Sequence, residues 1–174
     1  MKLTELFLAE LEREAVSTRA ALRRVPEGHN DWKPHPKSMA LGYLAGLVAA
    51  IPSWVAMMIK RDEVDLKAPE SERFKPVEWC TRSELISALD AGLKEARQAL
   101  SETTDQHLMM PWKFVAGGQL VNEDPRHIMI RDAVFSDLAQ HRGQLTIYLR
   151  LNEASVPGIY GASADESFLD VQTL

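Results

Sequence analysis

The chain has 174 residues, of which 45% are hydrophobic and 26% charged, and this composition is typical of one globular domain, residues 1–174. Because 20 basic and 25 acidic residues give a net charge of −5 and no stretch gathers Lys and Arg into a basic face, we expect no nucleic-acid partner. The N-terminal segment carries acids where a secretion signal needs an apolar run, and Cys80 is the single cysteine, so we expect a cytoplasmic protein.

The first predicted helix covers residues 3–22. Apolar side chains recur there at intervals of three and four, and the opposite face is charged. This stripe consists of Leu3, Phe7, Leu11, Ala15, Thr18 and Leu22. A loop with three prolines follows, and Ser38 is the expected N-cap of the second helix.

The second predicted helix, Met39 to Ile59, contains no charged residue over a length that could cross a bilayer. Two alternatives follow, a membrane span or the central helix of a bundle. The other helices carry narrow apolar stripes that need a common partner, which favours the bundle, and we expect no membrane association. Pro52 should kink or divide this helix, and small residues such as Gly42 and Gly46 should allow a neighbour to approach closely.

The second half of the chain supplies two more helices and a non-helical segment between them. Thr81 and Glu84 form a capping box that begins the third helix, whose stripe is Leu85, Leu89, Leu93, Ala96 and Leu100. The Gly117-Gly118 pair between apolar runs indicates a short hairpin or an extended loop. Asp124 and Pro125 then form the expected start of a last helix that runs to Leu151.

These elements predict an all-α protein, an antiparallel four-helix bundle with long loops. A long connection is expected between the second and third helices. The tail "VPGIYGASADE", residues 156–166, is rich in turn formers. We expect it to pack as an ordered loop across the bundle, with disorder as the alternative.

The stretch "FSDLAQHRGQLTIYLRL" places an acid and a histidine, Asp137 and His141, one turn apart on or beside the apolar stripe of the last helix. A buried carboxylate is unfavourable unless it has a partner. Asp137 should therefore pair with His141, or both should bind one metal ion. The spacing alone leaves both alternatives open.

Three segments, "HRGQLTIYLRL", "VPGIYGASADE" and "DWKPHPKSMALGYLAGLVAAIPSW", together resemble the DinB-like superfamily of four-helix bundles, which includes the YfiT-type proteins. The resemblance implies a homodimer and a divalent metal held by one histidine of the second helix and two of the fourth. These positions fall on Leu47, Asp137 and His141. Only His141 matches, so Asp137 and His141 are the expected metal ligands of a degenerate site.

The resemblance implies a divalent-metal-dependent hydrolase or thiol transferase that uses zinc, nickel or manganese. The alternative is a non-catalytic bundle that has lost its metal and serves as a small-molecule-binding or dimeric interaction protein. The only loose candidates for a third ligand are His35, His107, His127 and Glu14.

Several other residues have weaker signals. Arg142 lies off the apolar stripe and is expected to pair with an acid at the surface or at a subunit contact, and Tyr148 is expected in the core. Cys80 has no base beside it, so we assign it no catalytic role. Three tryptophans could line a cleft at the end of the bundle or anchor loops, namely Trp32, Trp54 and Trp112.

Overall fold

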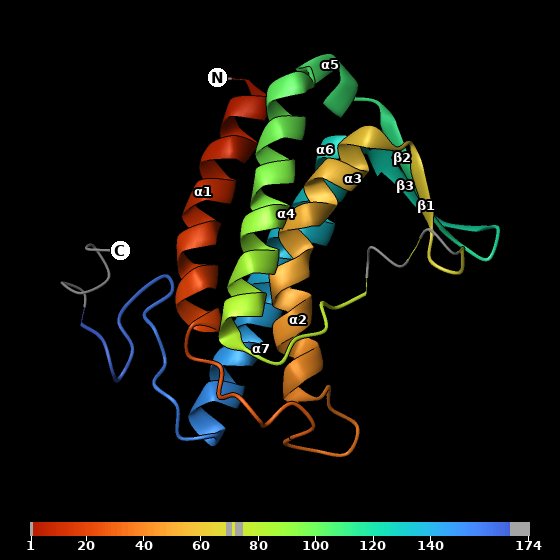
Figure 1. Ribbon diagram of the computed structural model, residues 1–174. Coiled ribbons are helices and arrows are strands. Elements are labelled where there is room, and N and C mark those ends of the chain that lie inside the picture. Colours follow the sequence, from red (N-terminus) through yellow and green to blue (C-terminus); the bar gives the residue numbers. More distant parts are fainter. Residues whose placement is uncertain (1, 69–70, 72–74, 168–174) are drawn as a thin grey trace.

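The structure, a computed structural model, describes residues 2–68, 71 and 75–167. Four helical columns lie side by side in it, with a small sheet at one end of the bundle (Figure 1). The columns are α1 (Leu3–Leu22), then α2 (Leu41–Ala50) continued by η1 (Ile51–Ser53) and α3 (Trp54–Lys60), then α4 (Arg82–Glu102), and finally α6 (Arg126–Ile130) continued by η3 (Arg131–Ser136) and α7 (Asp137–Leu151). A short helix, α5 (Asp105–Leu108), follows α4.

Local signals placed most helix ends correctly. The first helix has the predicted bounds, and α4 begins at the predicted capping box. In that box the Thr81 hydroxyl accepts from the Glu84 N–H, and the Glu84 carboxylate accepts from the Thr81 N–H at 2.8 Å. Pro52 lies in η1, the 3-10 turn that divides the second column, as its missing N–H requires.

Two predicted caps are wrong. The N-cap of α2 is Ala40, two residues after Ser38, and it has no side-chain cap bond. Asp124 caps no helix because it lies in a strand, opposite Trp112, and the N-cap of α6 is Pro125. Strand pairing therefore holds Asp124 in the sheet, so this residue is not at the start of the helix.

The second and third columns run in the same direction, so the bundle is not antiparallel throughout. Near the start of α2, the Trp79 indole N–H, three residues before α4, donates to the Gly42 carbonyl at 2.9 Å. At the other end, the His107 ring, just after α4, lies 2.9 Å from the carbonyl oxygen of Ile59 in α3. The long connection between these columns returns the chain to its starting end, which makes the parallel arrangement possible (Figure 1).

A three-stranded sheet corrects the all-α prediction, since the protein is mostly helical but not wholly so. Of the two predicted alternatives, a hairpin or an extended loop, the hairpin is present as β2 (Pro111–Ala116) and β3 (Gln119–Pro125), and its turn residues Gly117 and Gly118 have φ of 63° and 77°. A third strand, β1 (Glu63–Asp65), pairs in parallel with β2 and comes from the connection between α3 and α4.

Asp65 fastens β1 to the hairpin. Its carboxylate accepts backbone N–H bonds from Lys67, Gly117 and Gly118 at 2.9, 2.7 and 2.8 Å. These bonds, led by the one from Lys67, lower the pKa of Asp65 because they favour its charged form. The turn is thereby held against β1, which fixes the sheet as one unit.

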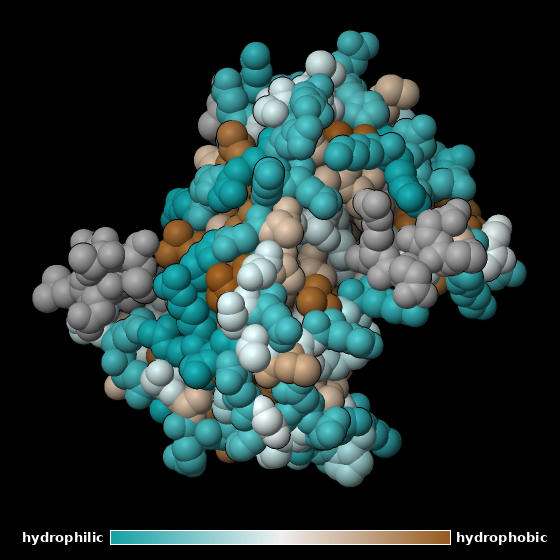
Figure 2. Space-filling view, in the orientation of Figure 1, coloured by the Kyte–Doolittle hydropathy of each residue, from teal (hydrophilic) through white to brown (hydrophobic). Residues whose placement is uncertain are grey.

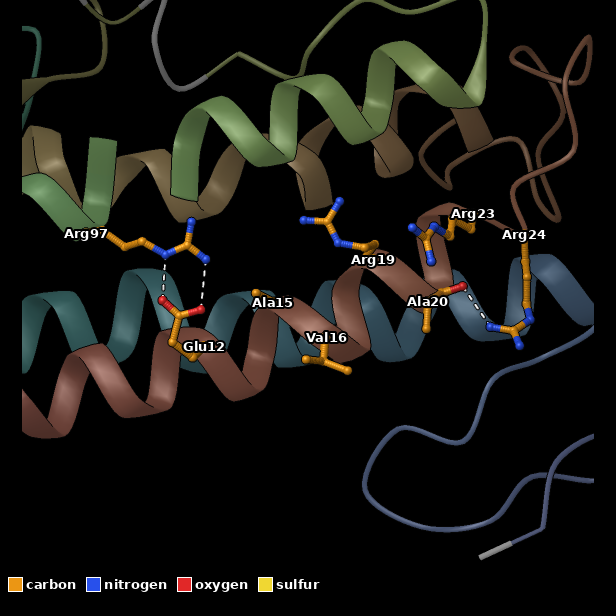
Figure 3. Close-up of a pocket in the computed structure, with 8 residues that line it drawn as sticks. All are labelled: Glu12, Ala15, Val16, Arg19, Ala20, Arg23, Arg24 and Arg97. Atoms are coloured by element: carbon orange, nitrogen blue, oxygen red, sulfur yellow. Dashed lines mark hydrogen bonds and ion pairs between the residues drawn. The ribbon is translucent and has the colours of Figure 1, made fainter. Parts of the chain in front are cut away.

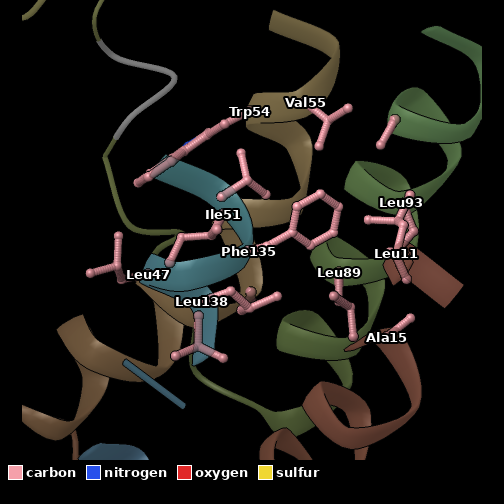
Figure 4. Close-up of a cluster of buried hydrophobic side chains, with 14 of the residues drawn as sticks. Leu11, Ala15, Leu47, Ile51, Trp54, Val55, Leu89, Leu93, Phe135 and Leu138 are labelled. Atoms are coloured by element: carbon pink, nitrogen blue, oxygen red, sulfur yellow. The ribbon is translucent and has the colours of Figure 1, made fainter. Parts of the chain in front are cut away.

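One hydrophobic cluster joins all four columns. Figure 4 shows Leu11 of α1, Leu89 and Leu93 of α4 and Phe135 of η3 directed toward a common interior, and Val55 of α3 belongs to the same cluster. The second column, from Leu41 to Lys60, is long and apolar enough to cross a membrane, yet 89% of its most apolar window is buried by the bundle. On the face seen in Figure 2, hydrophilic residues predominate and apolar ones occur singly or in small groups.

The two glycines of α2, Gly42 and Gly46, face loop residues rather than another helix. A Cβ added at Gly46 would lie 2.2 Å from the backbone oxygen of Val77, in the segment that leads into α4. The Val77 N–H in turn donates to the Gly46 carbonyl at 3.3 Å. Only glycine permits this approach at position 46.

Within the described residues, the tail packs along the bundle, as predicted. Arg24, just after α1, forms an ion pair with Glu166. The Ser17 hydroxyl donates to the Ile159 carbonyl at 3.4 Å. The tail therefore covers part of α1 and α7.

Candidate functional site

Asp137 and His141 lie next to each other on α7, an arrangement that both alternatives left open by the spacing require. Oδ1 of Asp137 lies 3.3 Å from Nε2 of His141, and the two side chains are 32% and 14% exposed. The other ring nitrogen of His141, Nδ1, lies 2.9 Å from Oε1 of Gln144. With Nδ1 donating to Gln144, Nε2 is directed to the carboxylate. We call Asp137 and His141 the dyad.

Partial burial controls the ionisation of the dyad carboxyl. Loss of hydration raises the pKa of Asp137 above its usual range, and the nearby His141 opposes this effect only in part. A carboxyl group with a raised pKa in a cleft is typical of functional sites.

The dyad lies on the wall of a cleft of about 510 Å³, which we call the dyad cleft. One wall comes from the second column, and another from α6, η3 and α7. The sheet supplies the rest, together with Leu66, which follows β1. The lining residues are Tyr43, Leu47, Trp54, Met58, Leu66, Trp112, Phe114, Asn122, Met129, Asp132, Ala133, Asp137 and His141. Leu47, Asp137 and His141 thus lie in one cleft, as the family resemblance implied.

The π-helical segment η3 directs a second acid into the dyad cleft. A π-turn closes between residues five apart, so Asp132 comes to the same side as Asp137. In a regular α-helix residues five apart lie on different faces, and the 3.6-residue period used on the sequence therefore missed Asp132. Ala133, beside it, leaves room in the cleft.

The sheet closes the cleft with alternate residues of its strands. Trp112 and Phe114 are two apart on β2, so they share one face, and Asn122 of β3 lies opposite Phe114. A bulge between Phe114 and Val115 shifts the register there. The sequence indicated the hairpin, but no local signal showed that it would cover the dyad.

The donors do not reach the three-ligand set of the resembled metal site. Leu47, at the third position, is 8% exposed and has no donor atom. Within the described part of the chain, no group of three or more His, Cys, Asp or Glu residues is placed to hold a metal ion.

The other donors considered from the sequence are not among the residues lining the cleft. The rings of His107 and His127 lie against the carbonyls of Ile59 and Leu108, at 2.9 and 3.2 Å. His35 is exposed and accepts the N–H of a residue in its own loop.

Arg142 is buried within the bundle, which corrects the prediction that it pairs with an acid at the surface or at a subunit contact. Its guanidinium donates to the Glu14 carboxylate at 2.5 Å, to Thr18 Oγ1 at 2.9 Å and to the Tyr160 hydroxyl at 2.6 Å. The predicted pairing with an acid is confirmed, but it takes place inside the protein. Glu14, a loose candidate for a metal ligand, is thereby held on α1.

The predicted aromatic residues have different roles. Trp54 and Trp112 line the dyad cleft, whereas Trp32 packs edge-on against Tyr148 with ring centroids 5.5 Å apart. Tyr148 is in the core as predicted, and its hydroxyl donates to the Met39 carbonyl at 3.1 Å. The sequence therefore identified two of the four aromatic residues of the cleft and missed Tyr43 and Phe114.

A second hollow, of about 350 Å³, lies on α1 beside α4 and contains four arginines (Figure 3). Its positive charge is largely compensated. Arg97 makes two bonds to the Glu12 carboxylate, Arg19 pairs with Asp90, and Arg24 pairs with an acid of the tail. These ion pairs join elements to one another, and we assign the hollow a structural role.

Comparison with known proteins supports the fold. The sequence matches no protein-family model and no curated protein. A DinB-like protein from Bacillus subtilis superimposes with a TM-score of 0.63 at 15% identity, covering 86% of this chain and 94% of that one. A DinB-like protein from Bacillus cereus ATCC 10987 gives a TM-score of 0.68 at 23% identity, covering 90% and 97%. The chain has a DinB-like fold.

Proposed function

We propose that the dyad cleft binds a small molecule with an apolar body and a polar head. A partly desolvated carboxylate on the wall of an apolar cleft is the observation that carries this proposal, because burial disfavours the charged form of Asp137 and this side chain is not part of the hydrophobic core. Apolar walls with a few convergent polar groups are the usual form of a ligand site. Leu47 adds to the apolar wall where a metal ligand would otherwise stand.

A cleft-filling variant tests the proposal. Ala133→Trp should occupy the space next to the dyad, and Ala9→Trp, at an exposed position of α1, is the matched control. A library of small amphiphiles is screened against the native protein by saturation-transfer NMR. We expect compounds that bind the native chain and the control but not Ala133→Trp. If every binder of the native chain also binds folded Ala133→Trp equally well, the cleft is not the site.

A second candidate function is metal-dependent catalysis as a hydrolase or thiol transferase, with Asp137 and His141 as the protein ligands. It is favoured by the dyad geometry, because Gln144 orients Nδ1 of His141 and leaves Nε2 directed toward Asp137. The measurement is metal analysis of protein purified without a histidine tag. Near-stoichiometric zinc, nickel or manganese that disappears in His141→Ala supports this function, and a metal content unchanged by His141→Ala contradicts it.

A further inference from the structure

We infer that the polar head of the ligand in the dyad cleft is an organic cation, an alkylammonium or quaternary ammonium group. This inference rests on the proposed function, because it requires the cleft to hold a ligand. It comes from two independent properties of the lining residues, their charge and their aromatic content.

The charged groups of the cleft favour a cation. Two carboxyl groups, Asp132 and Asp137, line it, and none of its described lining residues is Lys or Arg. His141 is the one basic side chain among them, and it is already paired with Asp137. An anionic head would be repelled by two carboxylates, of which Asp137 is partly buried, whereas a cationic head would be attracted by both.

The aromatic content favours an organic cation over a metal ion. Four aromatic residues from three parts of the fold line the cleft, namely Tyr43, Trp54, Trp112 and Phe114. Aromatic rings attract ammonium groups electrostatically and also pack against their alkyl substituents. A divalent metal instead needs several oxygen or nitrogen ligands, which these rings do not supply.

The apolar side chains define the rest of the ligand. Leu47, Met58, Leu66 and Met129 line the cleft together with the rings. Methionine adapts its shape to irregular ligands. A molecule with an ammonium head and a short hydrocarbon or aryl body therefore matches the cleft in charge and polarity.

A pair of isosteric probes separates the charge of the head from its shape. Phenyltrimethylammonium and tert-butylbenzene have nearly the same shape and differ by one positive charge. Each is titrated into the native chain by saturation-transfer NMR at concentrations that both reach in water. We expect the cation to bind about tenfold more tightly than the neutral compound, as cation–π and carboxylate contacts together imply.

Charge-removing variants then test the residues. Asp132→Asn combined with Asp137→Asn keeps the shape of both side chains and should lower the affinity for the cation about tenfold, while leaving that for the neutral probe unchanged. Glu123→Gln is the matched control. Glu123 neighbours Asn122 on β3, so it points to the opposite face of the strand, and it is not a lining residue.

The outcomes separate this inference from the proposed function. If the neutral probe binds as tightly as the cation, or if the double variant weakens both probes equally, the organic-cation inference is wrong and small-molecule binding stands. If neither probe binds and no other amphiphile does, both proposals fail. The asparagine variants keep this test valid even if Ala133→Trp does not fold.

Discussion

Restoring the two absent histidines tests whether the dyad cleft corresponds to the metal site of the resembled family. Leu47→His combined with Asp137→His would place three imidazoles in one cleft, two of them one turn apart on α7 and one on α2. Three protein ligands with open positions suit zinc or nickel. The native pair offers one imidazole and one carboxylate, so we expect the double variant to bind zinc far more tightly than the native chain.

The expected magnitude follows from linkage. At zinc concentrations 100 times the dissociation constant, binding stabilises the folded state by about 2.7 kcal/mol. For a chain of this size that corresponds to a rise in Tm of about 5–10 °C. Replacing Leu47, which is 8% exposed, by a polar ring costs about 1–2 kcal/mol in the absence of metal. The informative comparison is therefore one variant with and without zinc.

Calorimetric titration and thermal melts in zinc and in chelator provide the assay. Asp137→His alone should gain less affinity, because Leu47 still lacks a donor in the third direction. Adding His141→Ala to the double variant should abolish most of the gain, which shows that the metal is bound in this cleft. A folded double variant without increased zinc affinity would show that the three positions do not converge, and the inferred correspondence would fall.

Three further predictions concern stability. Burial raises the pKa of Asp137 in the folded protein above its pKa in the unfolded chain. The unfavourable effect of its charge on stability is therefore present at pH values above the folded pKa and absent below the unfolded pKa. Asp137→Asn should therefore raise Tm at pH 7 by an amount worth less than about 1 kcal/mol and leave it unchanged near pH 3, and a lower Tm at pH 7 would contradict this. Gly46→Ala should destabilise strongly because of the Val77 carbonyl, whereas Gly143→Ala, with nothing within 4 Å, should stabilise α7 by about 0.5–1 kcal/mol; equal effects in urea unfolding would count against the packing described. Arg142→Met should cost about 3–5 kcal/mol by leaving the Glu14 carboxylate without a positive partner, bonded only by the neutral Tyr160 hydroxyl, and a loss below about 1 kcal/mol would show that the ion pair is unimportant.

Elements defined by local chemistry were predictable from the sequence. The capping box at Thr81 and the Gly117-Gly118 turn depend on residues within a few positions of one another, and both are present as predicted. The dyad belongs to the same class, because Asp137 and His141 are four residues apart on one helix. In each case the sequence spacing already determines which atoms meet.

Features that depend on distant partners were not predictable. The strand β1 has three residues and is defined only by its pairing with β2, about 50 positions further along the chain. Arg142 was expected at the surface or at a subunit contact because it lies off the apolar stripe, and its partner Glu14 lies 128 positions earlier. Asp132 was missed for another reason, since its direction depends on a local change of helical period in η3.

Leu47 separates the two proposed functions of the dyad cleft. A donor at position 47 would complete a three-ligand metal site with the dyad, whereas leucine removes the third ligand and extends the apolar wall formed by Trp54, Met58 and the sheet. With two protein donors, a metal would need water molecules at its remaining coordination positions, and the aromatic wall supplies no ligand for them. Asp132 and Asp137 still line the cleft, and both would attract a positively charged group. An ammonium group satisfies that requirement without further ligands, so the change that disfavours a metal favours an organic cation.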